Sequence, residues 1–328
     1  MASSEKNLAP KSVTELGKIR SIISESVTWV DIIDPTQTEM AKLAKDYPFH
    51  PLNLEDSIST RQTTKVEEHQ EYLFIALRFP VEDSLGIISS NQVSMFLGKN
   101  YLVTLHPNKL RVLSELFQTC NDDAQGKKAL MKSTAYLVYR IINKLTESMF
   151  RILDDVQSGL DDIETKVFDE KKSSASAINR VRRQIAILRQ IIFPLRLFVP
   201  EITSKAQKYS EEVLSVFFSD INHKIGRASG TVEEMKEMVE IYKDTDFIIS
   251  SDRTNSVLSI LTILFTLSIP ATLISSIYGM NIPLPGGLVT GPLNFFGPYT
   301  SLLVLLIGML IPALVMVWYF RRVGWFNA

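Results

Sequence analysis

Two long runs without a charged side chain constrain this chain more than any other feature of its sequence. The first extends from Val257 to Ile277 and the second from Tyr299 to Phe320. At 1.5 Å per residue, each run is about long enough to cross a hydrocarbon core of roughly 30 Å. Buried helices of soluble proteins seldom extend this far without a charge. We therefore expect two membrane-spanning helices, 257–277 and 299–320, rather than two buried core helices.

The charges that flank the two runs predict how the chain is oriented. Arg253 precedes the first run, Arg321 and Arg322 follow the second, and the connector 278–298 carries no charge. Basic residues favour the cytosolic side of a membrane, so both termini are expected in the cytosol. The first twenty residues contain no apolar segment typical of a cleavable signal sequence. The expected location is the cytoplasmic membrane, with two spans in contact with lipid.

The sequence before the first run changes character near Lys127. Short strand-like runs precede that point, and Gly-Lys-Asn at 98–100 is typical of a hairpin. Long helical patterns follow it, and the last of them meets no proline before Pro270, so it can continue into the first span. The expected organisation is an N-terminal tail (1–25), a cytosolic α/β domain (26–126), a long-helix stalk (127–253) and a two-span transmembrane domain (254–328).

Composition and motifs argue against several function classes. The chain has 35 Lys and Arg residues against 36 Asp and Glu, so bulk positive charge for binding nucleic acid is absent. A single cysteine, Cys120, excludes an intrachain disulfide and a four-cysteine metal site. The four histidines are scattered and no phosphate-binding or nucleophile motif occurs, so neither an enzyme nor an organic cofactor is expected. Two uncharged spans cannot enclose a hydrophilic path alone, so a conducting protein must be an oligomer.

One face of the first run mixes polar and bulky side chains at three- or four-residue spacing. Its members are Asn255, Leu258, Thr262, Phe265, Ile269, Thr272, Ser276 and Gly279. On spacing alone, helix packing and pore lining explain such a stripe equally well. Tyr-Gly-Met-Asn (278–281) follows immediately. Amide oxygens suit hydrated Mg²⁺, because this ion sheds water reluctantly and neutral acceptors bind its waters without trapping it.

These residues resemble the CorA family of divalent-cation channels, which carries a Gly-Met-Asn signature, usually preceded by Tyr, at the end of the first of two C-terminal spans. The resemblance covers the chain from about Ser26 to the C-terminus. It is carried by SDRTNSVLSILTILFTLSIPATLISSIYGMN, HPLNLEDSISTRQTTKVEEHQEYLFIAL, RQIIFPLR and YFRRVGWF. It implies a funnel-shaped homopentamer, with an α/β cytosolic domain followed by long α-helices and two C-terminal transmembrane helices, the first of which lines a central pore.

The resemblance also implies roles for residues of the first span. Gly279, Met280 and Asn281 match the selectivity filter at the extracellular mouth. The matching residues for the pore lining and gate are Asn255, Leu258, Leu261, Ile269 and Thr272. Apolar rings can stop a hydrated ion by dewetting, although Leu258 and Leu261 can equally be packing residues. Family members often carry an acid in the connector, whereas the connector here has none.

Regulatory metal sites between neighbouring subunits are a further implication. The matching carboxylates are Asp56 and Asp220, with Glu55 as a possible ligand. Carboxylates that face each other across an interface repel when empty and are bridged by Mg²⁺, so intracellular Mg²⁺ would stabilise a closed assembly. Without the resemblance, both aspartates read as ordinary surface charges.

The expected function is therefore Mg²⁺ transport by a potential-driven pentameric channel gated by intracellular Mg²⁺, which also passes Co²⁺ or Ni²⁺. A Zn²⁺ transporter of the same fold is one alternative, although the signature offers no His or Cys for a softer ion. A membrane-anchored Mg²⁺ sensor without conduction is another.

Overall fold

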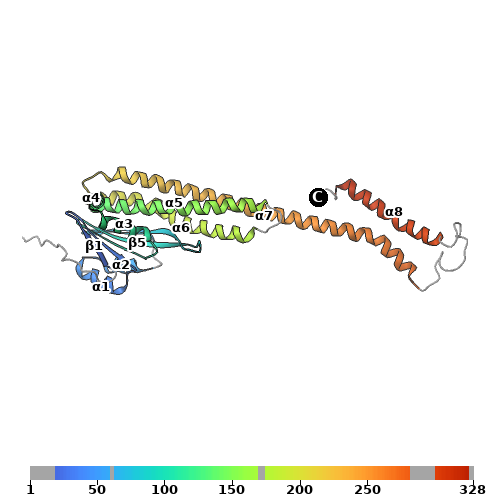
Figure 1. Cartoon of the computed structure of the whole chain (residues 1–328), viewed down its shortest axis with the longest axis horizontal. Helices are drawn as coiled ribbons and strands as arrows, with labels where there is room; N and C mark the ends of the chain where they lie inside the picture. Colours follow the sequence, from blue (N-terminus) through green and yellow to red (C-terminus); the bar gives the residue numbers. More distant parts are fainter. Residues whose placement is uncertain (1–18, 60–62, 169–173, 281–299, 325–328) are drawn as a thin grey trace, which may run out of the picture. The chain divides into compact units, whose positions relative to one another are not determined.

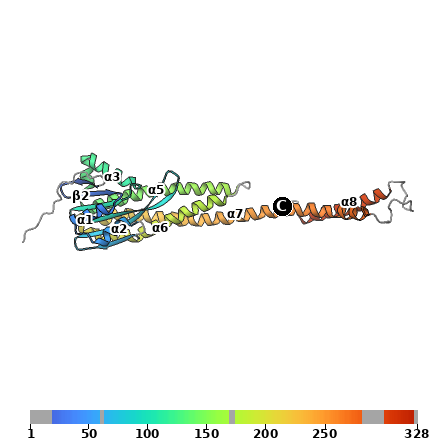
Figure 2. The same cartoon turned by 90° about the horizontal axis from the view of Figure 1, so that it is seen from below.

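The computed structural model describes residues 19–59, 63–168, 174–280 and 300–324. The chain divides into two compact units, Met1–Lys243 and Asp244–Ala328. The first unit combines a sheet with helices on both of its faces, and the described residues of the second unit form helices (Figures 1 and 2).

A six-stranded sheet organises the first unit. Its strands are β1 (Ile19–Ile23), β2 (Thr28–Ile33), β3 (Lys65–Glu68), β4 (Tyr72–Glu82), β5 (Ile88–Gly98) and β6 (Tyr101–His106). Their spatial order is β1-β2-β6-β5-β4-β3, and only β2 and β6 pair in parallel. The expected hairpin joins β5 to β6. A Cβ atom at Gly98 would lie 2.4 Å from the ring of Tyr101, so the turn requires glycine there.

Two short strands form the edges of the sheet. β1 falls within the range 1–25 that was expected to be a tail, and it pairs antiparallel with β2 at the edge of the sheet. β3 has only four residues and pairs with β4 at the opposite edge. Short edge strands carry too few alternating residues to be recognised by period, because their pairing depends on a distant partner.

Helices cover both faces of the sheet (Figure 1). On one face, α1 (Gln37–Asp46) and α2 (Pro51–Ile58) bury Met40, Leu43 and Leu54 against the strands. α1 begins where Thr36 and Glu39 form a capping box, and α2 begins with His50 as its cap. On the other face lie α3 (Arg111–Asp122), α4 (Ala124–Leu130), α5 (Thr134–Val167) and α6 (Ala175–Ala206).

The long helices belong to the same compact unit as the sheet. α5 and α6 contact β4 and β5. The first part of α7 (Leu214–Tyr278) runs beside α5 (Figure 1). Phe217 of α7 packs against Tyr136 and Tyr139 of α5, with ring centroids 5.4 and 5.2 Å apart. A stripe at helical spacing along α7 is fully buried: Leu214, Phe218, Ile221, Ile225, Ala228, Val232, Met235 and Val239. The division expected at residue 126 therefore does not separate two compact bodies.

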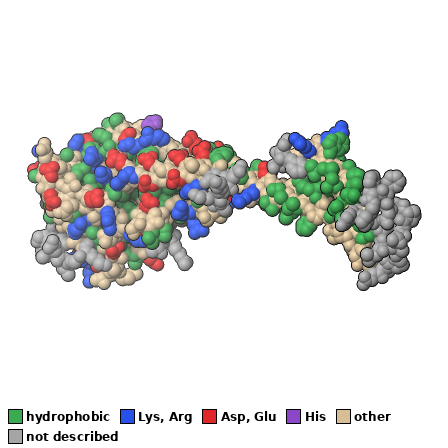
Figure 3. Space-filling view, turned by 45° about the vertical axis from the view of Figure 1, so that its right-hand side comes forward, with side chains coloured by type: hydrophobic (Ala, Val, Ile, Leu, Met, Phe, Trp, Pro, Cys, Tyr) green, Lys and Arg blue, Asp and Glu red, His purple; other side chains and the backbone are tan. Residues whose placement is uncertain are grey.

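The second unit contains the end of α7 and α8 (Thr300–Val323). α7 continues without a break to Tyr278, as the absence of proline before Pro270 predicted. Among the described residues, these two helices are long and apolar enough to cross a membrane. Charged side chains spread over the first unit, whereas hydrophobic side chains dominate the surface of this unit (Figure 3).

The single cysteine lies in α3. Cys120 is fully buried, and burial raises the pKa of its thiol.

Candidate functional site

The described part of the signature closes the C-terminal end of α7. The N–H of Gly279 donates to the carbonyl of Ser275 at 2.9 Å, and the N–H of Met280 donates to the carbonyl of Ile277 at 3.3 Å. A Cβ atom at residue 279 would lie 3.0 Å from the oxygen of Ser275. Any larger residue must push this carbonyl aside, so glycine keeps the last turn tight. Asn281 lies outside the described residues.

The pore-lining candidates share one side of α7. Each residue advances about 100° around a helix, so the steps of three and eight residues from Asn255 through Leu258, Leu261 and Ile269 to Thr272 remain within one face. All five side chains are exposed in the single chain. The structure thus places them on a common exposed face of α7.

Hydroxyl groups on this face are satisfied within the helix. Thr262 Oγ1 donates to the carbonyl of Leu258 at 2.7 Å, and Thr272 Oγ1 donates to the carbonyl of Ser268 at 2.8 Å. With its proton engaged, each hydroxyl turns an oxygen acceptor outward. Such a face can accept hydrogen bonds from the water around a cation without carrying charge.

Asp56 of α2 forms an ion pair with a lysine. Its Oδ2 lies 2.5 Å from Lys65 Nζ, and the same ammonium lies 2.9 Å from Glu67 Oε1. Burial by itself lowers the pKa of Lys65, but hydrogen bonds and charge from Asp56 and Glu67 outweigh it and raise the pKa. Lys65 therefore stays an ammonium ion. Glu55, the possible further ligand, is exposed on the same helix.

Asp220 of α7 is also paired with a lysine. Its Oδ2 lies 2.6 Å from Lys224 Nζ, one helical turn further on, and its side chain is 57% exposed. Lys224 also donates to Asn143 Oδ1 of α5 at 2.9 Å and lies 3.9 Å from Glu147 Oε1.

In a single chain, Asp56 on α2 and Asp220 on α7 are each paired with a different lysine. Among the residues that the structure describes, no group of three or more His, Cys, Asp and Glu side chains is arranged to hold a metal ion. The donor chemistry nevertheless fits Mg²⁺, because carboxylate oxygens are among its preferred ligands. Asp56 and Asp220 each supply one carboxylate, which is compatible with a site completed by another copy of the chain.

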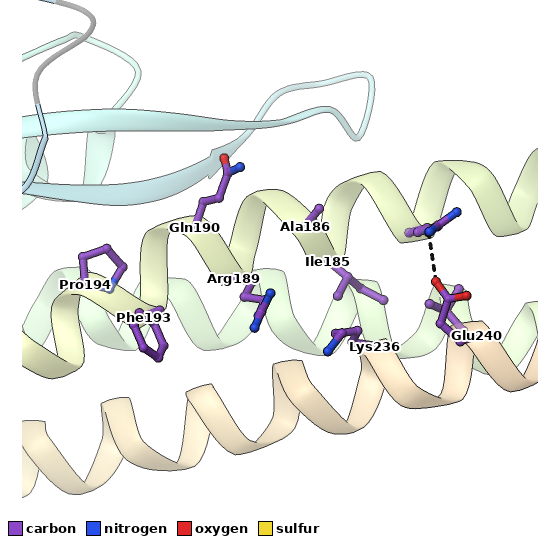
Figure 4. A pocket seen from close by; sticks show the side chains of 10 residues that line it. Ile185, Ala186, Arg189, Gln190, Phe193, Pro194, Lys236 and Glu240 are labelled. Carbon is purple, nitrogen blue, oxygen red and sulfur yellow. Dashed lines mark ion pairs between the residues drawn. The ribbon is translucent and has the colours of Figure 1, made fainter.

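An open groove of about 530 Å³ lies between α6 and the first part of α7. An ion pair crosses it, as Arg182 Nε lies 3.0 Å from Glu240 Oε1 (Figure 4). A second ion pair joins the same two helices, with Arg189 Nε 2.5 Å from Glu233 Oε1. Phe193 and Pro194 give it an apolar end. None of the residues expected to bind or conduct ions lines this groove.

A buried polar network was not singled out from the sequence. Asp31 of β2 is fully buried and forms ion pairs with Arg20 (2.5 Å) and His106 (3.2 Å), and Thr104 Oγ1 donates to its Oδ1 at 2.6 Å. Trp29 Nε1 donates to the Thr104 hydroxyl at 3.0 Å. Burial raises the pKa of Asp31, but the hydrogen bonds and charge from His106, with those from Thr104 and Arg20, outweigh it and lower the pKa. The network stabilises the only parallel strand pair of the described sheet.

Comparison with known proteins gives the family. The family described as CorA-like Mg²⁺ transporter protein matches residues 24–322. The chain belongs to this family. The CorA match includes strands β2 to β6, the long helices and nearly all of both apolar helices, so the α/β domain, long helices and two C-terminal apolar helices predicted from the sequence are confirmed.

Individual CorA proteins resemble the chain over nearly its whole length. The cobalt/magnesium transport protein CorA of Thermotoga maritima is 27% identical over 307 residues, which cover 92% of this chain and 84% of that protein. The putative metal ion transporter YfjQ of Bacillus subtilis is 28% identical over 306 residues, or 91% and 90% of the two chains. The complete structure of the CorA magnesium transporter from Methanocaldococcus jannaschii has a TM-score of 0.78 at 20% identity and covers 95% of this chain and 100% of that one.

Proposed function

We propose that this chain transports Mg²⁺ across the cytoplasmic membrane as a homopentameric channel with both termini in the cytosol. The observation that carries the proposal is the Tyr-Gly-Met-Asn signature directly after the uncharged segment 257–277 of α7, in a chain that the CorA family matches over 24–322. The relatives named for magnesium or cobalt transport support the same cargo.

The path for the ion requires several copies of the chain. Two uncharged membrane-spanning segments in one chain leave no enclosed hydrophilic route, so the proposed pore is lined by one α7 from each of five subunits. The hydroxyl acceptors of Thr262 and Thr272 face hydrated ions in it, and Leu258, Leu261 and Ile269 form narrow apolar rings that close by dewetting. Asn255 lines the inner mouth. Gly279, Met280 and Asn281 form the filter at the outer mouth.

The membrane potential supplies the driving force. Moving one elementary charge across 100 mV is worth about 2.3 kcal/mol, and a divalent ion gains about twice that. Capture at the outer mouth relies on amide and backbone oxygens, because the connector carries no acidic residue.

Uptake into proteoliposomes tests the proposal. Mg²⁺ influx is measured at an imposed inside-negative potential, with low Mg²⁺ on the regulatory side and protein-free liposomes as the control. We expect influx that rises with the potential. Absence of influx would favour a Mg²⁺ sensor. Replacing Mg²⁺ by Co²⁺, Ni²⁺ or Zn²⁺ in the same assay measures ion selectivity, and transport of Zn²⁺ alone would overturn the assignment of the cargo.

We propose that Asp56 and Asp220 mediate inhibition by intracellular Mg²⁺. Asp220→Ala, alone or with Asp56→Ala, is expected to shift the inhibition curve to about tenfold higher Mg²⁺, because the carboxylates no longer hold the bridging ion. Influx measured against Mg²⁺ on the cytosolic side checks this. Glu211→Ala is the matched control, since this acid is exposed just before α7. A curve that superimposes on that of the wild type would remove these residues from regulation.

A further inference from the structure

In the structure, each of the two proposed regulatory carboxylates forms an ion pair with a lysine. Asp56 Oδ2 lies 2.5 Å from Lys65 Nζ, and Asp220 Oδ2 lies 2.6 Å from Lys224 Nζ. The two pairs are formed in different ways: Lys65 comes from β3 and reaches α2, whereas Lys224 lies one turn along α7 from its partner. Local helix spacing therefore does not account for both.

Each ammonium is held by more than its aspartate. Lys65 also contacts Glu67 Oε1 at 2.9 Å and lies 5.2 Å from the ring centroid of Phe74. Lys224 also donates to Asn143 Oδ1 at 2.9 Å. The lysine side chains are only 20% and 26% exposed, so both ammonium groups are partly shielded from solvent.

We propose that Lys65 and Lys224 are internal counter-ions that compete with Mg²⁺ for Asp56 and Asp220, and thereby raise the Mg²⁺ concentration at which the regulatory sites fill. This inference rests on the proposed regulatory role of the two aspartates. It assigns the lysines a positioning role, since they act on Mg²⁺ through the carboxylates.

Electrostatics gives the direction of the effect. A cation that binds either carboxylate must share it with an ammonium ion or displace that ion from a favourable pair. Both routes weaken Mg²⁺ binding. Without the lysine charge, the negative charge of the carboxylate is no longer partly neutralised. Mg²⁺ should therefore bind more tightly to the variant than to the wild type.

Thermal unfolding of the full-length protein in detergent, at a series of free Mg²⁺ concentrations, tests the proposal without measuring transport. Binding to the native state raises Tm, so the midpoint of the Tm increase reports how readily the site fills. Lys65→Gln and Lys224→Gln are each expected to lower this midpoint about three- to tenfold. Lys224→Arg, which keeps the charge, should remain close to the wild type.

Matched controls separate competition from a structural role. Lys208→Gln and Lys236→Gln remove lysines paired with Glu68 and Glu233 at 2.5 and 3.3 Å, and should leave the midpoint unchanged. A purely structural lysine would change Tm without Mg²⁺ but not the midpoint. In the Asp56→Ala/Asp220→Ala background, neither lysine change should have an effect.

Two results would overturn the proposal: an unchanged or higher midpoint in both Lys→Gln variants, or a wild-type Mg²⁺ response that the double alanine variant retains. The wild type can also fail to take up Mg²⁺ in proteoliposomes while its Tm still depends on Mg²⁺ as expected. That result would contradict the channel proposal but not the proposed competition between the lysines and Mg²⁺.

Discussion

Asn281→Ala is expected to reduce potential-driven Mg²⁺ influx at least about tenfold while the protein still assembles. The variant removes from every subunit the amide that is proposed to bind the water shell of the ion. Because every subunit contributes one Asn281 amide to the proposed filter, the variant loses one favourable contact with the hydrated ion in each subunit. The combined effect on permeation should therefore be large. Assembly should persist, because the change leaves α5, α6 and the buried stripe of α7 (214–239) untouched, and these belong to the first compact unit.

Influx is measured in proteoliposomes at matched content of assembled protein. Asn294→Ala is the control, because Asn294 is the other asparagine between Gly279 and Tyr299. Full Mg²⁺ influx in Asn281→Ala would argue that the filter lies elsewhere and would count heavily against the channel proposal.

Asp31→Asn is expected to produce the largest loss of stability. The change keeps the shape of the side chain but leaves Arg20 and His106 facing a neutral amide in the interior. Removing one partner from a buried charge network costs about 3–5 kcal/mol. Hydrogen exchange of the β2 and β6 amides in the full chain should accelerate about a hundredfold or more. Glu25→Gln, at an exposed site, should change exchange little.

The pH dependence of this effect has a definite sign. The pKa of Asp31 lies below its ordinary value of 3.8 in the folded protein. Its contribution to stability is therefore fully present above that value and is lost as the pH falls through the lower folded-state pKa. The difference between wild type and Asp31→Asn should shrink on acidification in this range. A difference that is constant down to the lowest pH would show that the carboxylate charge is not what stabilises the network.

The sequence predicts the elements that have a strong period or an unusual composition. The uncharged runs, the long helical stripes and the Gly-Lys-Asn turn all reappear as α7, α8, α5, α6 and the β5–β6 hairpin. The pairing of strands across the sheet is harder to predict from the sequence, because β1 and β3 are short and depend on β2 and β4 for their hydrogen bonds. The packing of the long helices within the first compact unit also depends on contacts such as that of Phe217 with Tyr139, which join distant parts of the chain.

The candidate site shows the same limit. Spacing alone places Leu258, Ile269 and Thr272 on one face of α7, because a helix fixes the direction of each side chain. Lys224 is likewise visible as the residue four positions after Asp220. No local signal places Lys65 beside Asp56 or His106 beside Asp31, since both contacts are made between different elements of the fold.

Burial of Cys120 has a practical consequence for labelling. The chain contains no second cysteine, and the thiol in α3 is shielded from solvent with a raised pKa that keeps it protonated. Thiol reagents should therefore leave the native protein unmodified. A cysteine introduced on the exposed face of α7, for example at Leu258, becomes the single reactive position, and cross-linking between copies can then measure how closely these helices approach each other.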